Sequence, residues 1–306
     1  MTEPQLPVQI AVPRKGRPLE AVLDRLASVA DAAHVADDVI STLRFEKSIT
    51  KDDQRAERDI YSRLSEYSDI TDPYSPDFTL LRDDRDGKPR RIVFDSLTID
   101  VDGTPVQLVG REEPFRALRT HEFALGFDSA DLVLEEVVTL DAAPLTEITD
   151  LNDRIDPHDT DVRVVSGLGD TVYHTLMATP ETLRNGPRAV LDRAFIDEYA
   201  GALCISPRYE RLVEAVLGTG AASGLTFTYP DPGLEEEAAI ADTGIGIYLT
   251  VSGNTARDHG LELGDRLFPS ETVLLENISE SAPAPIEAVK RALATPASET
   301  AIAPPN

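Results

Sequence analysis

Residues 245–261 read IGIYLTVSGNTARDHGL, an apolar run followed by a small polar turn and a helix-like segment. Glycine lets a backbone approach an anion closely, and the hydroxyl and amide side chains around it add hydrogen-bond donors. A following helix N-terminus supplies free amides. Ser252, Gly253, Asn254 and Thr255 are therefore a candidate phosphate-binding turn. The same residues also fit an ordinary turn with a helix N-cap, so both interpretations stay open here.

The second half of the chain alternates between strand-like and helix-like segments. Such alternation favours layered α/β architecture. An apolar strand over 8–12 is likewise followed by apolar residues at helical spacing up to Ala30. The expected helices are 189–199, 209–217 and 234–240, and the expected strands between and after them are 201–205, 225–229 and 245–250.

Between about 37 and 91 the sequence becomes polar and interrupts the alternation. Residues 52–67 have the composition of an exposed helix. Residues 69–89 are rich in Asp, Pro and Ser, which is typical of a long loop, and we expect mobility there.

Composition limits the class of protein. The chain has 306 residues, 41% of them hydrophobic, which is enough for two folded domains. No apolar run is long enough for a membrane span and no signal peptide is evident, so we expect a soluble cytoplasmic protein. The single cysteine, Cys204, excludes an internal disulfide, and no Cys or His spacing indicates a structural metal site.

The net charge of -26 argues against nucleic acid or an anionic membrane as partner, because phosphate polymers would be repelled. Acidic residues number 55, and among 29 basic residues only five are lysines. This balance suits a salt-rich, halophilic cytoplasm in which ions screen the repulsion; an acidic protein of ordinary habitat is the alternative. The lysines are Lys15, Lys47, Lys51, Lys88 and Lys290.

A second cluster, Pro13-Arg14-Lys15-Gly16-Arg17, gathers three cations at the carboxyl end of the first expected strand. Open α/β sheets place ligands at such ends. The cluster can hold a polyphosphate, or it can be a solvated loop that neutralises neighbouring acids.

Other candidates give weaker signals. Glu235 opens an expected helix, where the helix dipole explains a carboxylate, although it could also face a ligand ribose. The five histidines are scattered and no serine or cysteine lies in a recognisable nucleophile turn, so a hydrolytic triad has no support.

Taken in order, these segments resemble ATP phosphoribosyltransferase, the first enzyme of histidine biosynthesis, outside about 37–91. IAVPRKGR at 10–17 resembles that family's first strand and its proline-lysine-glycine turn. Residues 95–109 followed by Arg111 resemble its hairpin and arginine, and LGFDSADLV at 125–133 resembles its glycine motif ending in Asp-Leu-Val. The match continues through 165–181, 231–240, the turn 252–255 and 266–276.

The resemblance implies a fold of two α/β lobes of periplasmic-binding-protein type II, with mixed sheets and an inter-lobe cleft. We expect lobe I to span 1–160 and to be completed by 277–295. Lobe II then spans 161–276 and carries the phosphate turn, and 296–306 form a frayed tail. The segment after Glu276 is too short for the C-terminal regulatory domain of the long-form enzyme, so a short-form-like member is expected.

The resemblance also implies the chemistry. The family transfers the phosphoribosyl group of phosphoribosyl pyrophosphate (PRPP) to N1 of ATP, with Mg²⁺ shielding the pyrophosphate. By resemblance, the turn 252–255 binds the 5-phosphate, Lys15, Arg17 and Arg111 face the nucleotide or the pyrophosphate, and Glu235 faces the ribose. No protein ligand to a metal and no catalytic residue is assigned. A homodimer is expected, and a separate regulatory subunit is left open.

The chain also departs from the family pattern. An ungapped match places Gly244 and Tyr248 where the family has acids that face the ribose or the magnesium. Ala124 replaces another acid, and Asp128-Ser129 replaces a Thr-Gly pair. Two alternatives therefore stay open: a non-catalytic paralogue that binds another phosphorylated metabolite, and phosphoribosyl transfer to a different base.

Overall fold

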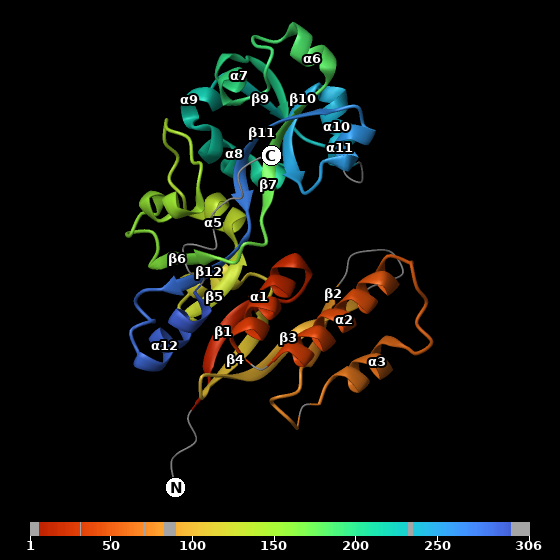
Figure 1. The fold of residues 1–306 in the computed structure, drawn as a ribbon, viewed down its shortest axis with the longest axis vertical. Coiled ribbons are helices and arrows are strands. Elements are labelled where there is room, and N and C mark those ends of the chain that lie inside the picture. Colours follow the sequence, from red (N-terminus) through yellow and green to blue (C-terminus); the bar gives the residue numbers. More distant parts are fainter. Residues whose placement is uncertain (1–5, 31, 70, 83–89, 232–234, 295–306) are drawn as a thin grey trace. The chain divides into compact units, whose positions relative to one another are not determined.

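The computed structural model describes residues 6–30, 32–69, 71–82, 90–231 and 235–294 (Figure 1). The chain divides into two compact units. Unit 1 contains residues up to Asp128 together with Asp161–Asp170 and the part from Thr272 onward, and unit 2 contains Ser129–Thr160 and Thr171–Glu271. Each unit is described below by itself.

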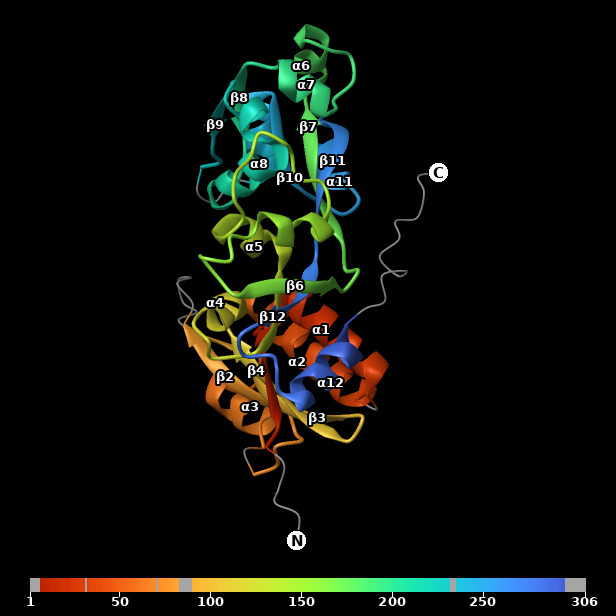
Figure 2. The ribbon, with the colours of Figure 1, turned by 90° about the vertical axis from the view of Figure 1, so that its left-hand side faces the viewer.

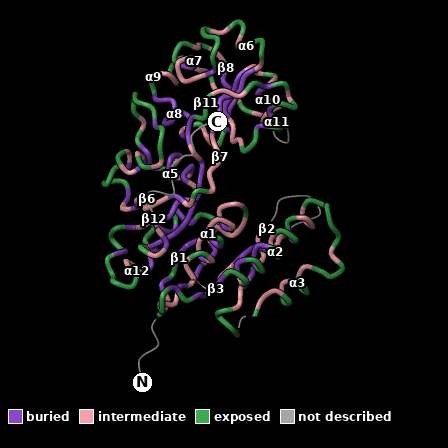
Figure 3. Tube along the Cα trace, viewed as in Figure 1, coloured by how far each residue is buried: buried purple, intermediate pink, exposed green. Residues whose placement is uncertain are grey.

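Unit 1 is built on a seven-stranded mixed sheet in the order β2-β3-β4-β1-β5-β12-β6. β1 runs parallel to β4 and β5, whereas β2, β3 and β4 form an antiparallel meander and β12 is antiparallel to β6. The middle strands are largely buried, as expected for strands covered on both faces (Figure 3). The strands are β1 (Val8–Pro13), β2 (Asp77–Arg82), β3 (Arg90–Val101), β4 (Thr104–Arg111), β5 (Leu125–Ser129), β6 (Val162–Gly167) and β12 (Thr272–Asn277).

The helices of unit 1 supply the rest of its core. α1 buries Leu19, Val22, Leu23 and Leu26, whose spacing puts them on one face of the helix. α1 packs beside both α2 and α12 (Figure 2), and Arg25 of α1 donates hydrogen bonds to backbone carbonyls at the end of α12. The helices are α1 (Gly16–Val29), α2 (Ala33–Thr50), α3 (Ile60–Tyr67), α4 (Pro114–Arg119) and α12 (Ala284–Leu293).

The segment 37–91 is more structured than its composition indicated. The exposed helix expected over 52–67 is wrong in its bounds. α2 ends before this range, a loop follows, and only the short α3 lies within it. The expected long loop over 69–89 is also wrong in part, since 77–82 form β2 and pair with β3. Residues 70 and 83–89 lie outside the described part. Buried Val39 and Ile40 of α2 and Phe78 of β2 give the segment its place in the core.

Unit 2 has a five-stranded mixed sheet in the order β11-β7-β10-β8-β9. β7 is antiparallel to β10 and β11, and β8 is parallel to β10 and β9. The strands are β7 (Val172–Ala178), β8 (Gly201–Cys204), β9 (Leu225–Thr228), β10 (Ile245–Thr250) and β11 (Glu262–Ser270). The helices are α5 (Ala130–Glu136), α6 (Pro180–Asn185), α7 (Arg193–Glu198), α8 (Glu210–Leu217), α9 (Thr219–Ala222), α10 (Glu236–Thr243) and α11 (Asn254–Asp258), with 3₁₀ turns η1 (Ile148–Asp150), η2 (Asn152–Arg154) and η3 (Pro207–Tyr209).

The observed units differ from the expected lobe ranges. Residues 129–160, expected in lobe I, group with unit 2, while 161–170 and 272–276, expected in lobe II, group with unit 1. The reason is strand pairing: β6 and β12 join the sheet of unit 1, and the residues around them go with that sheet. The expected frayed tail, 296–306, lies outside the described residues.

Candidate functional site

The turn 252–255 connects β10 to α11 in unit 2. Gly253 is the N-cap of α11 and adopts the left-handed region at φ 69°, while no side chain caps the helix. A Cβ at Gly253 would overlap the side chain of Leu263, so the position needs glycine for both space and conformation. Ser252, Asn254 and Thr255 are exposed around it. The turn thus presents three polar side chains on a fixed backbone.

Arg257 is a residue of this turn that the sequence analysis missed. Its Nη1 donates to the carbonyl of Ser252 and to Oδ1 of Asn254, both at 3.0 Å. The side chain is exposed, so the guanidinium adds positive charge at the open face of the turn. Its position on the first turn of the short helix after Thr255 is the signal that could have indicated it. Arginine beside hydroxyl and amide donors is a combination suited to phosphate.

Tyr248 occupies the strand position where the resembling family has an acid. Burial, the charge of Glu236 and a hydrogen bond to that carboxylate raise the pKa of Tyr248 to about 12. The phenol is therefore neutral at ordinary pH and can donate a hydrogen bond but carries no charge. Glu236 on α10 supplies a negative charge beside the phenol.

Gly244, at the other position of an expected acid, ends α10 in the left-handed region at φ 98°. A Cβ there would lie 2.6 Å from Thr182 Oγ1, so no side chain fits without displacing Thr182. A glycine C-cap of this kind is a common helix ending. In this chain Gly244 is needed for the left-handed end of α10, which explains why an acid is absent.

Glu235, the candidate ribose-facing residue, lies at the N-cap of α10. Its Oε2 is 3.0 Å from His259 Nε2, at the end of α11. The structure therefore brings Glu235 beside the helix that follows the phosphate turn. Its carboxylate remains largely exposed.

The three candidate cations Lys15, Arg17 and Arg111 lie in unit 1. Pro13 of β1 is in register with Arg111, the last residue of β4, so Lys15 and Arg111 lie at the carboxyl ends of two parallel neighbouring strands. Lys15 Nζ is 3.5 Å from Glu112 Oε2, and the guanidinium carbon of Arg111 lies 4.9 Å from the centre of the Phe123 ring. The structure thus brings two of the predicted cations to one edge.

Arg17 begins the first turn of α1 and is held by Asp170, with Nη1 at 3.2 Å from Oδ2. Asp170 in turn accepts hydrogen bonds from the backbone N–H and the hydroxyl of Thr272 at 2.7 and 2.9 Å. Arg14, the third cation of the sequence cluster, turns away to the Gly110 carbonyl and Asp95. Arg14 is therefore explained by structure alone.

Asp131, from the glycine motif, belongs to a buried polar network of unit 2. Its two carboxylate oxygens lie 3.1 Å from His174 Nε2 and 2.8 Å from the Ser270 hydroxyl that donates to it. All three side chains are buried. The network links α5 to β7 and β11, which gives this aspartate a structural role.

No group of three or more His, Cys, Asp or Glu side chains in the described residues is placed to hold a metal ion. Over the same part of the chain, none of the helices has the length and apolar character needed to cross a membrane.

Two α/β units with mixed sheets, an open polar turn built on glycine and a cationic strand edge define an α/β protein with features suited to phosphorylated ligands. The sequence model described as halobacterial ATP phosphoribosyltransferase matches residues 2–304, and the chain belongs to this family. The resemblance found in the sequence is confirmed, and so is the expected α/β class with mixed sheets.

Solved structures that match the chain include the ATP phosphoribosyl transferase (HisG:HisZ) complex from Thermotoga maritima, at 13% identity and TM-score 0.41, with 94% of this chain and 96% of that chain covered. YhfZ from Shigella flexneri is another, at 11% identity and TM-score 0.41, with 95% and 91% covered. None of the curated proteins compared with the chain matches it.

Proposed function

We propose that the protein transfers the phosphoribosyl group of PRPP to N1 of ATP, the first step of histidine biosynthesis. The bond from ribose C1 to the pyrophosphate oxygen breaks, the bond from C1 to adenine N1 forms, and pyrophosphate leaves with the electron pair. Family membership over residues 2–304 supports the reaction class. The observation that carries the proposal for this chain is the turn 252–255, whose glycine, exposed donors and Arg257 suit a phosphate.

In this proposal the turn and Arg257 hold the 5-phosphate of PRPP. Lys15, Arg17 and Arg111 hold the pyrophosphate or the nucleotide, and Glu235 faces the ribose. Magnesium, when bound, neutralises pyrophosphate oxygens; the described residues offer single carboxylates rather than a cage, so the ion would be held mainly by phosphate oxygens and water. We further propose a cytoplasmic homodimer, with a regulatory subunit as an open partner.

The protein's contribution to such a reaction is mainly positioning and charge. A dissociating pyrophosphate needs fixed positive groups more than a nucleophile or a general base. The residues assigned above are arginines, a lysine and hydrogen-bond donors, in agreement with that need.

A second candidate is a non-catalytic member that binds a phosphorylated metabolite in the same site. The specific observation in its favour is the neutral Tyr248 and the backbone role of Gly244, where the family has acids. If Glu236 supplies the missing charge through its hydrogen bond to Tyr248, transfer activity is retained. If it does not, binding persists without turnover.

The test is incubation of the purified chain with ATP, PRPP and magnesium in KCl, with phosphoribosyl-ATP and pyrophosphate followed by chromatography. Formation of both products in equal amounts is the expected result. PRPP binding by calorimetry without any product would favour the binding protein. Pyrophosphate release with a different purine but not with ATP would indicate another acceptor base.

A further inference from the structure

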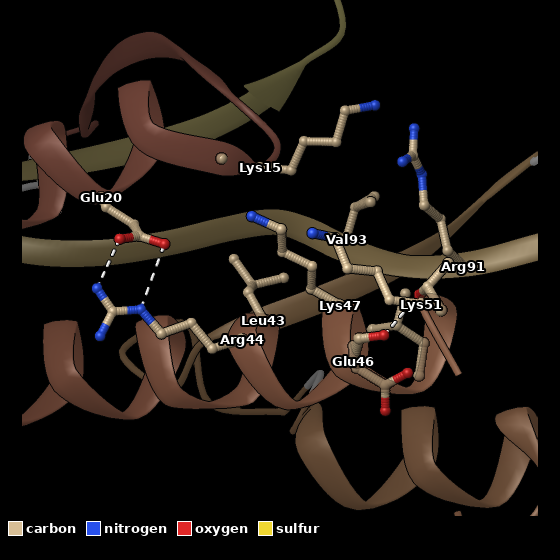
Figure 4. Close-up of a pocket in the computed structure, with 12 residues that line it drawn as sticks. Lys15, Glu20, Leu43, Arg44, Glu46, Lys47, Lys51, Arg91 and Val93 are labelled. Atoms are coloured by element: carbon tan, nitrogen blue, oxygen red, sulfur yellow. Dashed lines mark hydrogen bonds and ion pairs between the residues drawn. The ribbon is translucent and has the colours of Figure 1, made fainter. Parts of the chain in front are cut away.

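A pocket of about 290 Å³ lies in unit 1 beside the start of α1, with walls from α2 and β3 (Figure 4). Three of the chain's five lysines, Lys15, Lys47 and Lys51, are among its lining residues, together with Arg91. In the close-up Lys15 comes from the start of α1, Lys47 and Lys51 from the region of α2, and Arg91 from β3, whereas the pair formed by Glu20 and Arg44 lies apart from them. Such a concentration is unexpected in a chain of net charge -26.

The carboxylates that line the pocket are already matched by guanidinium groups. Glu20 Oε2 is 2.7 Å from Arg44 Nη2, and buried Glu46 receives two hydrogen bonds from Arg63, at 2.7 and 2.9 Å. In the part of the chain that the structure describes, neither Lys47 nor Lys51 forms an ion pair. Their charges are therefore available to an anion that enters the pocket.

Helix energetics explain only part of this arrangement. Lys47 lies in the last turn of α2 and Lys51 is its C-cap, where a cation favours the negative end of the helix dipole. That effect acts within one helix. It gives no reason for Lys15, which precedes α1, to line the same cavity as the two lysines of α2.

We propose that Lys47 and Lys51, acting with Lys15, bind the oligophosphate chain of a nucleoside triphosphate. The inference rests on the proposed function, because Lys15 is the residue that the pocket shares with the proposed nucleotide site. Lysines are flexible point charges with three donors each, which suits a chain of phosphates. Lys47 and Lys51 come from the segment 37–91, which the motifs of the sequence resemblance do not cover but which lies within residues 2–304 matched by the halobacterial family. The two lysines are therefore a determinant of chains that carry this segment.

The size of the pocket suits a small polyanion. Its volume of about 290 Å³ is close to the lower end of the range for ligand pockets, roughly 300–1,000 Å³, so it can take up a chain of phosphates. Leu43, Ile92 and Val93 form the apolar part of the wall, while Lys47 and Lys51 keep exposed side chains that an anion can reach. Because lysine charges line the pocket, we expect affinity to rise with the number of phosphates on the ligand.

The test compares the full-length wild type with the K47Q/K51Q variant, using calorimetry with inorganic tripolyphosphate, ATP and AMP at one fixed KCl concentration. A matched control, R58Q/R188Q, removes the same charge from two exposed ion pairs outside the pocket. We expect K47Q/K51Q to weaken tripolyphosphate and ATP by at least about tenfold, to change AMP by less than about threefold, and to melt like the wild type. The control should bind all three like the wild type.

Unchanged tripolyphosphate and ATP binding in K47Q/K51Q would overturn the inference, as would an equal loss for AMP and ATP. If K47Q/K51Q forms product with the same KM for ATP as the wild type, the inference about the lysines is overturned while the proposed function stands. Conversely, if the wild type binds tripolyphosphate through the two lysines and yet forms no product, that result supports the oligophosphate site and rejects only the proposed function.

Discussion

Gly253 shows how a single residue fixes the candidate site. Its left-handed backbone turns the chain out of β10 and into α11, and the absent Cβ leaves room for Leu263 of β11. The polar side chains beside it are then placed by the backbone, and Asn254 is held further by the hydrogen bond that its Oδ1 accepts from Arg257. Such preorganisation lowers the entropic cost of holding a phosphate.

Thr255→Val is the residue-scale test of this turn. The Thr255 side chain is exposed, and valine has almost the same shape, so folding should be unaffected. If the hydroxyl donates to the 5-phosphate, the change costs about 1 to 3 kcal/mol of PRPP binding, roughly fivefold to 150-fold in Kd. Calorimetric titration with PRPP measures this.

The matched control is Thr149→Val, an exposed threonine of unit 2 in η1. Both variants should melt at the wild-type temperature. PRPP affinity that stays the same in Thr255→Val would reject the assignment of the turn.

For single residues, the sequence was informative where a residue type favours one local structure. It was uninformative where the role of a residue depends on its contacts in the folded protein. Glycine followed by hydroxyl residues after a strand predicted the turn correctly as a local structure. Nothing local could show that Tyr248 meets Glu236, or that Arg257 reaches back to Ser252, because these contacts depend on how β10, α10 and α11 pack. Phosphate binding itself stays a prediction.

Helices α2 and α3 are joined by a buried ion pair. Arg63 of α3 donates from Nε and Nη2 to both oxygens of Glu46 on α2, and Tyr67 also donates to Glu46 at 3.1 Å. Burial, the Glu46 charge and this hydrogen bond raise the pKa of Tyr67 to about 12. The pair fixes α3 against α2 and, through α2, the wall of the lysine pocket.

Arg63→Met should therefore destabilise the protein strongly. It leaves the Glu46 carboxylate buried without its cation, which costs about 3 to 5 kcal/mol of unfolding free energy. Denaturant unfolding followed by circular dichroism measures the change. The double variant Arg63→Met/Glu46→Met should recover most of the loss, since no charge is then buried.

Arg58→Met is the control on the same segment, because Arg58 forms an exposed pair with Glu66 and should change stability little. Equal stability of Arg63→Met and Arg58→Met would contradict the role assigned to the buried pair.

At the scale of elements, periodic segments were predicted well and the segment 37–91 was not. Strands such as 245–250 carry a continuous apolar run that is typical of buried strands. α2 and β2 bury only a few residues, such as Val39 and Phe78, and the rest are intermediate or exposed, so their composition resembles that of a loop. Their order comes from packing on α1 and β3, which a local pattern does not record.

The charge of the whole molecule predicts its response to salt. A net charge of -26 destabilises a compact state by self-repulsion, and dissolved ions screen that repulsion. We expect the melting temperature to rise as KCl is raised from about 0.1 M to about 2 M. Differential scanning calorimetry measures this, and a melting temperature that falls with KCl would contradict the salt-adapted interpretation.

For the whole chain, alternation of strands and helices predicted the α/β class, and the order of motifs predicted the family. The assignment of residues 129–170 to units differed, because sheet membership depends on pairing between strands far apart in sequence. β6 pairs with β12, and no local pattern in either strand indicates its partner.

That pairing has a consequence for synthesis. β12 lies between β5 and β6 in the sheet of unit 1, yet it is translated after all of unit 2. During synthesis, β5 and β6 therefore have unpaired edges until β12 has been translated. Unpaired strand edges favour pairing with a wrong strand. Unit 1, which begins the polypeptide, is the last part of it to be completed.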